Sequence, residues 1–193
     1  MSDPKTVKGP ALYLALVHAP VINRRGEEIV AAVTNLDLHD LARLACTYEL
    51  PACYVVTPLK DQQKLVHRLI HHWLHGIGGQ LHPDRERALR RLRVASTLEE
   101  AIAHVEEEQG RPPFLWATSA RGSGTDVEPS EARLILEATG RPGMMVLGTG
   151  WGLSGKVWRL CHGTLRPVEG RGDYNHISVR CAAAILLDRF FRK

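Results

Sequence analysis

The sequence lacks the long apolar runs and paired cysteines that mark several classes of protein. No segment approaches the roughly 18 consecutive apolar residues of a membrane-spanning helix, and the opening MSDPKTVKGP has no apolar core of a secretion signal. The four cysteines form no C-x-x-C pair, which argues against a zinc knuckle, and each lies in or beside an apolar run. We therefore expect a cytoplasmic protein without a metal centre, whose cysteines are buried free thiols.

The net charge of the whole chain is small, but positive charge is concentrated in one segment. The chain has 193 residues, 44% of them hydrophobic and 24% charged, which suits one globular domain spanning residues 1–193. The net charge is only +4, yet residues 60–93 alone carry +5. The basic residues of this segment are Lys60, Lys64, Arg68, Arg85, Arg87, Arg90, Arg91 and Arg93. We predict a polyanion-binding patch on a basic helical segment, because neutralised phosphates release counterions; a solvated helix face is the alternative.

Short apolar runs alternate along the chain with segments of helical period. The pattern predicts strands at 11–20, 52–57, 114–118, 143–147 and 164–168, and helices at about 35–49, 61–75, 97–109, 129–139, 153–161 and 178–191. Such alternation is typical of an α/β fold with a mainly parallel sheet flanked by helices. In these sheets ligands bind beyond the carboxyl ends of the strands, where polar or glycine-rich loops follow Thr118, Leu147 and Val168.

A glycine motif follows the fourth of these strands in the chain. The run Gly150-Trp151-Gly152-Leu153-Ser154-Gly155 fits G-x-G-x-x-G, the pattern of dinucleotide-binding loops, and a nicotinamide oxidoreductase is the function it would favour. Only 43 residues follow Gly150, so most of a dinucleotide-binding half would have to lie upstream. The glycines still indicate that the backbone turns sharply or approaches a ligand closely.

The last helix is preceded by a polar loop and carries little polar surface. The loop ends in Tyr174-Asn175-His176-Ile177-Ser178, where Asn175 or Ser178 can cap the helix that follows. The helix is apolar on several sides, so we expect a second copy of the chain to cover one of them and form a homodimer.

Three of these stretches together resemble the SPOUT, or α/β-knot, RNA methyltransferases. The strongest match is VLGTGWGL at 146–153 followed by LRPVEGRGDYNHISVRCAAAILLDR at 165–189. The Ala-Arg-Leu-Ala of residues 42–45, with Asn35 upstream, resembles the first motif of that superfamily, and the loop 117–121 takes the place of another cofactor-contacting loop.

The resemblance implies a C-terminal trefoil knot that holds S-adenosylmethionine between three loops, with each site completed by a partner subunit. Main-chain groups of the last two loops would bracket the adenine. The cofactor residues implied in this way are Thr118, Ser119, Leu147, Gly148, Thr149, Gly150, Gly152, Leu165, Pro167, Gly170, Tyr174, Asn175, His176, Ile177, Ser178 and Val179.

The same resemblance implies methyl transfer to structured RNA, tRNA or rRNA, at a ribose hydroxyl or a base atom. Arg43 is the candidate that orients the acceptor, Asp173 or His176 accepts a proton, and Arg121 lines the acceptor pocket. Where the SpoU-like branch has Asn residues, this chain has Asp37 and His176, so ribose methylation cannot simply be carried over. A knot that binds S-adenosylmethionine without catalysing transfer is the alternative.

Overall fold

Six parallel strands form the centre of the computed structural model, which describes residues 9–192. The sheet has the order β5-β4-β1-β7-β6-β8. Its strands are β1 (Leu12–Val17), β4 (Cys53–Val56), β5 (Leu92–Ala95), β6 (Phe114–Ala117), β7 (Gly143–Gly148) and β8 (Gly163–Thr164). A small antiparallel hairpin, β2 (Val21–Ile22) and β3 (Glu28–Ile29), follows β1. The mainly parallel α/β fold predicted from the sequence is confirmed.

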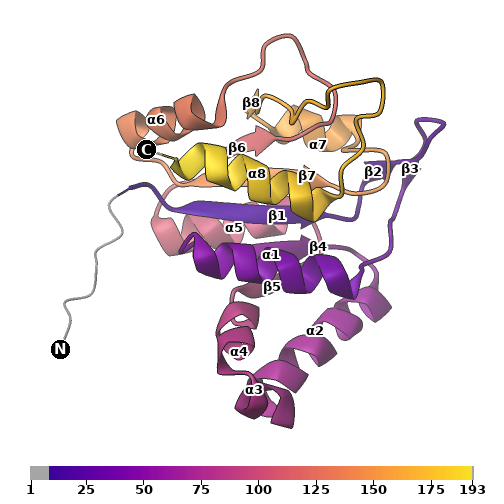
Figure 1. Cartoon of the computed structure of the whole chain (residues 1–193), viewed down its shortest axis with the longest axis vertical. Helices are drawn as coiled ribbons and strands as arrows, with labels where there is room; N and C mark the ends of the chain where they lie inside the picture. Colours follow the sequence, from indigo (N-terminus) through magenta and orange to yellow (C-terminus); the bar gives the residue numbers. More distant parts are fainter. Residues whose placement is uncertain (1–8, 193) are drawn as a thin grey trace.

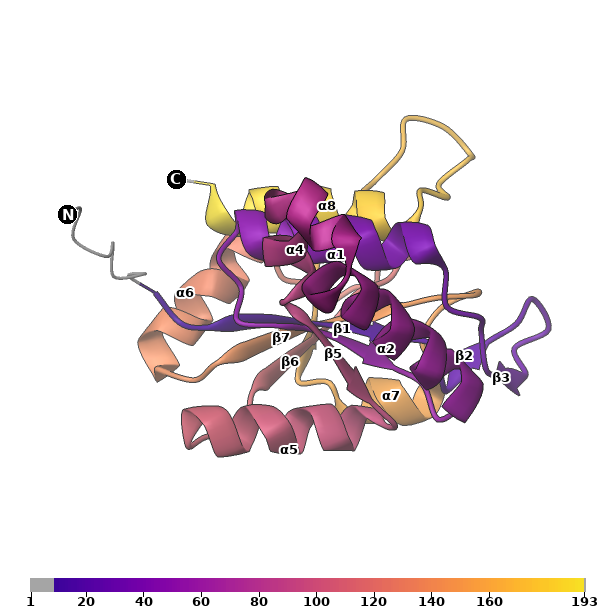
Figure 2. The same ribbon diagram turned by 90° about the horizontal axis from the view of Figure 1, so that it is seen from below.

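Helices cover both faces of this sheet (Figures 1 and 2). One face carries α1 (Asn35–Thr47), α6 (Pro129–Thr139) and α8 (Val179–Phe191), and the other carries α5 (Leu98–Gln109) and α7 (Gly155–Leu160). A helical projection packs against α1 and extends past the β5 edge of the sheet; it consists of α2 (Lys60–His75), α3 (Ile77–Leu81) and α4 (Pro83–Leu89). Because both faces are covered, all six residues of β1 are buried.

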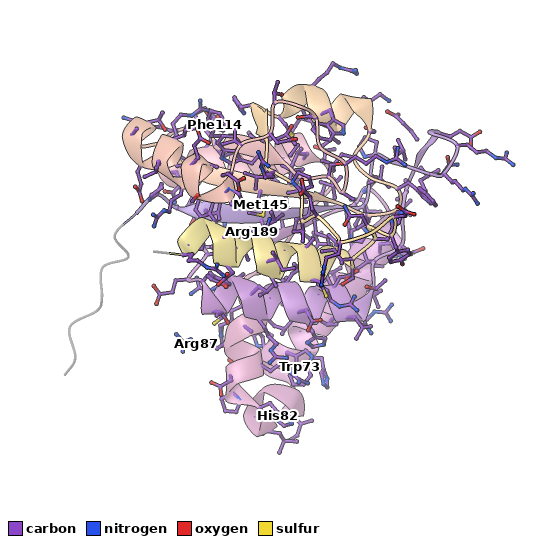
Figure 3. All side chains as sticks on the ribbon, turned by 45° about the horizontal axis from the view of Figure 1, so that its top comes forward. Trp73, His82, Arg87, Phe114, Met145 and Arg189 are labelled. Carbon is purple, nitrogen blue, oxygen red and sulfur yellow. The ribbon has the colours of Figure 1, made fainter. Side chains whose placement is uncertain are left out.

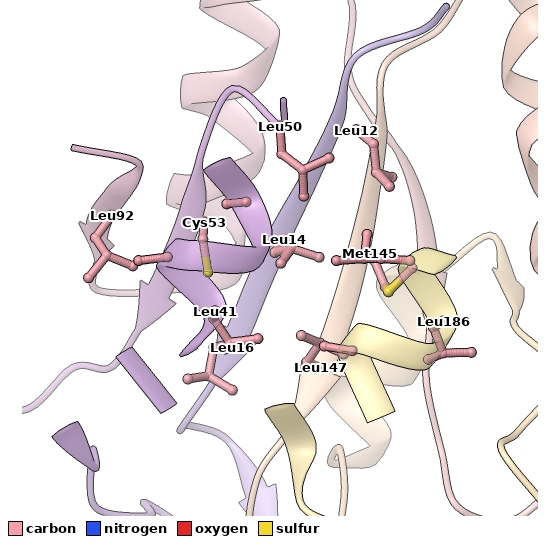
Figure 4. Close-up of a cluster of buried hydrophobic side chains, with 14 of the residues drawn as sticks. Leu12, Leu14, Leu16, Leu41, Leu50, Cys53, Leu92, Met145, Leu147 and Leu186 are labelled. Carbon is pink, nitrogen blue, oxygen red and sulfur yellow. The ribbon is translucent and has the colours of Figure 1, made fainter. Parts of the chain in front are cut away.

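The core on the α1 and α8 side is built from alternate strand residues. Leu14 and Leu16 of β1 lie beside Met145 and Leu147 of β7 in parallel register, and Leu186 of α8 packs onto them (Figure 4). The intervening residues of the same strands face α5 and α7. The helix α8 is therefore held by the sheet, by α1 and by α6.

Some boundaries differ from the predictions. The helix predicted at about 35–49 is α1, which ends at Thr47, and Thr34 caps its start because the Thr34 hydroxyl accepts the Asp37 main-chain N–H. Gly76 ends α2, and the two glycines that follow, Gly78 and Gly79, lie in the short α3. The strand predicted at 164–168 is wrong beyond Thr164, because pairing with β6 stops there.

The cysteine prediction is only partly correct. Cys53 is buried, Cys46 and Cys161 are partly buried, and Cys181 is exposed on α8. The neighbours of Cys181 along the helix, Ala183 and Leu187, take the buried face instead. No helix among residues 9–192 is long and apolar enough to cross a bilayer.

The C-terminal segment connects the two faces of the sheet. After β7 the chain forms α7 on one face, adds β8 beside β6, and ends as α8 on the other face. Residues 164–166 are bound to the segment that follows β6: the Val127 N–H donates to the Thr164 carbonyl, and the Arg166 N–H to the Val127 carbonyl, each at 2.8 Å. This route is consistent with a trefoil knot, which stays a prediction. The organisation of residues 1–193 as a single domain also stays a prediction, because residues 1–8 and 193 lie outside the described part.

Candidate functional site

Three loops meet at one edge of the sheet. They follow β7, β6 and β8, which are neighbours in the sheet, so the carboxyl ends of these parallel strands lie together. The loops span residues 118–128, 149–154 and 165–178. They contain all sixteen residues predicted to bind a cofactor except Leu147 and Gly148, which end β7, and Val179, which begins α8.

The glycine loop after β7 is a tight turn fixed against the hairpin. The Gly152 N–H donates to the Thr149 carbonyl at 3.1 Å, and Gly150 and Gly152 have φ of +62° and +120°. Main-chain hydrogen bonds of 2.9 Å join Ile22 to Trp151 and to Gly152. The sharp turn therefore accounts for these two glycines by itself.

Gly148 is required for a different reason. A Cβ at this position would lie 2.9 Å from the Leu153 nitrogen, so the loop could not return to α7 without a backbone shift. The helix that follows begins at Gly155 and has six residues, far shorter than the helix of a dinucleotide-binding unit. The G-x-G-x-x-G match is thus a turn leading into a short helix.

Asn175 fastens the C-terminal loop to the loop after β6. Its side-chain amide donates to the Ala120 carbonyl at 2.9 Å, and its side-chain oxygen accepts the Gly170 N–H at 3.1 Å. Asn175 is therefore not the helix cap; Ser178 caps α8 by accepting the Cys181 N–H. The amide holds together two of the three predicted cofactor loops.

A cavity of about 300 Å³ lies between these two loops. Its lining residues are Ala120, Gly122, Gly124, Asp126, Arg166, Pro167 and Glu169. Burial raises the pKa of Asp126, but hydrogen bonds from Ser123 outweigh it and hold that pKa below its usual value, so the carboxylate stays charged. The volume is at the lower end of the range for small-molecule sites, so the cavity fits a compact or bent ligand.

The predicted cofactor residues divide by accessibility. The side chains of Leu147, Leu165 and Pro167 are buried, so the two leucines can offer a ligand only main-chain groups, while Pro167 borders the cavity. The Thr118 and Thr149 hydroxyls donate to the Val146 and Val17 carbonyls, each at 2.9 Å, and so position the loop starts.

The candidate proton acceptors lie in the exposed part of the C-terminal loop. Asp173 and His176 are both solvent-exposed. The His176 ring lies between two other aromatic side chains, 5.8 Å from Trp151 and 5.7 Å from Tyr174 between ring centroids. Arg121 is exposed and lies in the chain between two cavity-lining residues, Ala120 and Gly122.

Arg43 lies away from the three loops. It lines a second cavity of about 360 Å³ between α1 and the helical projection, together with residues 81–85. None of these residues belongs to the three loops. Trp73 and His82, close to this cavity, mark its place on the projection in Figure 3. Within one chain, therefore, the structure does not bring Arg43 together with Arg121, Asp173 and His176.

Asp37 is engaged by a residue that the sequence reasoning missed. Arg180, in the first turn of α8, forms ion pairs with Asp37 at 3.0 Å and with Asp40 at 3.1 Å. The Asp37 carboxylate also accepts the Thr34 hydroxyl at 2.6 Å. The pairing joins the start of α1 to the end of the C-terminal loop; 143 residues separate the partners, so no local signal could have revealed it.

A second missed residue is His18, immediately after β1. Its side chain is fully buried, and neither ring nitrogen has a hydrogen-bond partner within residues 9–192. Burial lowers the pKa of His18, and the nearby Asp37 opposes that effect only in part. The imidazole is therefore neutral at pH 7, beneath the edge where the loops meet. No group of three or more His, Cys, Asp or Glu side chains in the described part could hold a metal ion.

Comparisons with known proteins agree with this fold. A family described as SAM-dependent RNA methyltransferase matches residues 11–192. A tRNA (guanine-N(1)-)-methyltransferase of Oleidesulfovibrio alaskensis is 44% identical over 181 residues, which are 94% of this chain but 42% of that protein. An uncharacterized protein of Aquifex aeolicus is 38% identical over 182 residues, 94% of this chain and 89% of that one.

A solved structure with the same fold contains the expected cofactor. The SpoU methyltransferase AviRb of Streptomyces viridochromogenes, in complex with AdoMet, matches with a TM-score of 0.59 and 14% identity, over 97% of this chain and 59% of that chain. At this identity the likeness shows the fold alone. The chain spans less than half the length of the Oleidesulfovibrio relative. The reaction in the name of that relative therefore refers to the longer protein.

Proposed function

The chain belongs to the family of S-adenosylmethionine-dependent RNA methyltransferases, and from that premise we propose that it methylates a structured RNA, tRNA or rRNA, in the cytoplasm. The observation that carries this proposal is the cavity between residues 120–126 and 166–169, at the edge where three predicted cofactor loops meet. The acceptor is a ribose hydroxyl or a base atom. The guanine-N(1) specificity of the longer relative is not extended to this chain.

S-adenosylmethionine supplies a methyl group that is already activated for in-line displacement. The chain's own groups bind and orient. Main-chain groups at the end of β7 and in the C-terminal loop would hold the adenine, and Asn175 joins the two walls of the cavity through its hydrogen bonds to Gly170 and Ala120. Asp173 or His176, both exposed beside the cavity loops, takes the proton of the acceptor.

Arg43 orients the acceptor or its phosphate, and a homodimer explains how it reaches the site. In one chain Arg43 faces residues 81–85 rather than the loops. On α8, Ile185 and Cys181 are exposed, and Leu134 is exposed on α6, which packs against α8. We assign this apolar surface to a second copy of the chain, so that each site receives residues from both copies.

The proposed function is tested by labelled methyl transfer. The chain is incubated with methyl-labelled S-adenosylmethionine and total RNA from cells in which its gene has been deleted, and the labelled nucleoside is identified by mass spectrometry. We expect label in one tRNA or rRNA nucleoside. Calorimetric binding of S-adenosylmethionine without transfer to any RNA would instead indicate a binding module.

RNA affinity is expected to depend on the free basic side chains of the projection (Figure 3). Arg90 pairs with Glu86, and Arg93 pairs with Glu108 of α5 at 2.7 Å, so these two contribute less than the sequence suggested. Arg87 of α4 and Arg91, which lies between α4 and β5, form no ion pair within residues 9–192. The double variant Arg87→Ala/Arg91→Ala should weaken RNA binding and reduce the slope of log K against log salt by about 1–2.

The matched control is Arg93→Ala, whose charge is already neutralised by Glu108. Its slope should equal that of the wild type in a salt titration followed by fluorescence anisotropy. An unchanged slope for Arg87→Ala/Arg91→Ala would contradict the assignment of the projection to RNA binding.

A further inference from the structure

Four side chains from three separate segments form a row on the surface at the site edge. Tyr174 and His176 come from the C-terminal loop, Trp151 from the glycine loop and Arg24 from the hairpin. The ring centroids of Tyr174 and His176 are 5.7 Å apart, and those of His176 and Trp151 are 5.8 Å apart. The Arg24 guanidinium carbon lies 5.9 Å from the Trp151 ring centroid.

The backbone beneath Trp151 and Arg24 is fixed by hydrogen bonds. The Trp151 N–H donates to the Ile22 carbonyl at 2.9 Å, which ties the glycine loop to the hairpin. In the hairpin turn the Asn23 side chain accepts the Arg25 and Glu27 N–H groups at 2.8 and 3.0 Å. The backbone that carries Trp151 and Arg24 is thus fixed before any ligand arrives.

This row is exposed, although large aromatic side chains are normally buried. Of the four tryptophans, Trp116 is in the core and two are partly buried, whereas Trp151 leaves 51% of its surface exposed. Tyr174 is 78% exposed, and Ile177 in the same loop is also exposed. No packing requirement of the described chain accounts for an indole here. An exposed, preorganised ring beside a cation is what a flat π-ligand with a phosphate requires.

We propose that Trp151 is a stacking platform for an unpaired base of the RNA substrate, with Arg24 engaging that nucleotide's phosphate or the base itself. The inference rests on the proposed function, which supplies RNA as the ligand. Trp151 lies between Gly150 and Gly152 of the predicted cofactor loop, so the stacked base is the acceptor nucleotide or its neighbour. A base inside a duplex cannot present its face to a side chain, so the substrate position is single-stranded, bulged or flipped out.

The test compares Trp151→Ala with Trp151→Phe, using short labelled single-stranded and duplex RNAs in fluorescence anisotropy. Trp151→Ala should weaken single-stranded RNA binding by about 10-fold to 100-fold and leave duplex binding within about 2-fold. Trp151→Phe retains a stacking ring and should recover most of the affinity. His104→Ala, which removes an exposed ring from α5 on the other face of the sheet, should leave both affinities unchanged.

Calorimetry with S-adenosylmethionine separates this inference from the proposed function. Trp151→Ala should bind the cofactor as the wild type does. Equal affinity of Trp151→Ala and wild type for single-stranded RNA overturns the inference. The inference is also overturned if Trp151→Ala loses cofactor binding but keeps its RNA affinity, because the row would then be an adenine site. A wild-type chain that binds RNA but no S-adenosylmethionine contradicts the proposed function, while the two Trp151 variants still decide the stacking role.

Discussion

Replacing Arg43 by alanine is expected to lower the rate of methyl transfer by about 100-fold, the loss typical of removing one charged donor that acts on the reacting group. Binding of S-adenosylmethionine should stay within about 2-fold of the wild type, because Arg43 shares no cavity with the three cofactor loops. Arg43 is exposed on α1, so its removal leaves no buried group unpaired and the fold should persist. The measurement is single-turnover transfer of labelled methyl, with cofactor affinity from calorimetry.

The matched control is Arg111→Ala. Arg111 is exposed and precedes β6, so it lies at the opposite end of that strand from the loops. Its rate should equal that of the wild type. If Arg43→Ala also retains the wild-type rate, Arg43 does not touch the acceptor and belongs only to the second cavity.

If each site of the dimer takes Arg43 from the partner subunit, Arg43→Ala should be complemented by a variant with a defect in the cofactor loops. At low cofactor concentration, Arg43→Ala mixed with a loop variant impaired in cofactor binding should be more active than either variant alone, because a mixed dimer contains one intact site. A mixture no more active than either variant alone would place Arg43 and the loops of one chain in the same site. The complementing loop variant is Gly148→Ala.

Elements with strong local signals were predicted closely. The helix at 129–139 has proline at its first position and glycine just after its end, and α6 spans those residues. The buried runs that became β1, β4 and β7 were found because strands covered on both faces need continuous apolar sequence. The short β8 was misjudged because its length depends on pairing with Trp116 and Ala117, 47 residues earlier, rather than on its own sequence.

The features of the candidate site were likewise predicted only where the local sequence carries a signal. The loops after β6 and β7 could be predicted because each follows an apolar strand and contains glycines or polar residues, whereas the C-terminal loop was found mainly through its resemblance to the last motif of the superfamily. The ion pairs of Arg180 with Asp37 and Asp40, the buried His18 and the contact of Arg24 with Trp151 could not, because each depends on segments that only the folded sheet brings together. The separation of Arg43 from the loops also depends on the position of the helical projection, which periodicity does not give.

Replacing Gly148 by alanine is expected to lower the affinity for S-adenosylmethionine by at least about 10-fold, since small displacements of a binding loop have large effects. The new Cβ would lie 2.9 Å from the Leu153 nitrogen and 3.1 Å from the Leu153 side chain. A main-chain atom cannot move aside alone, so the turn at 149–152 must shift with it, away from the geometry that brackets the adenine.

The cost to stability should be smaller than the loss of binding. Overpacking of this kind costs about 1–3 kcal/mol, and for a chain of this size each kcal/mol lowers the melting temperature by about 2–4 °C. Circular dichroism melts should therefore show a folded protein at 25 °C, and calorimetry measures the cofactor affinity of that folded form.

Gly155→Ala provides a control within the same glycine-rich stretch. A Cβ there meets only the end of the Arg159 side chain, at 3.6 Å, which is an ordinary contact, and alanine suits the first position of α7. Its affinity for S-adenosylmethionine should equal that of the wild type. Equal affinities for Gly148→Ala and wild type would show that the loop after β7 is no wall of the cofactor site, and the cavity between the other two loops would then have to hold the whole ligand.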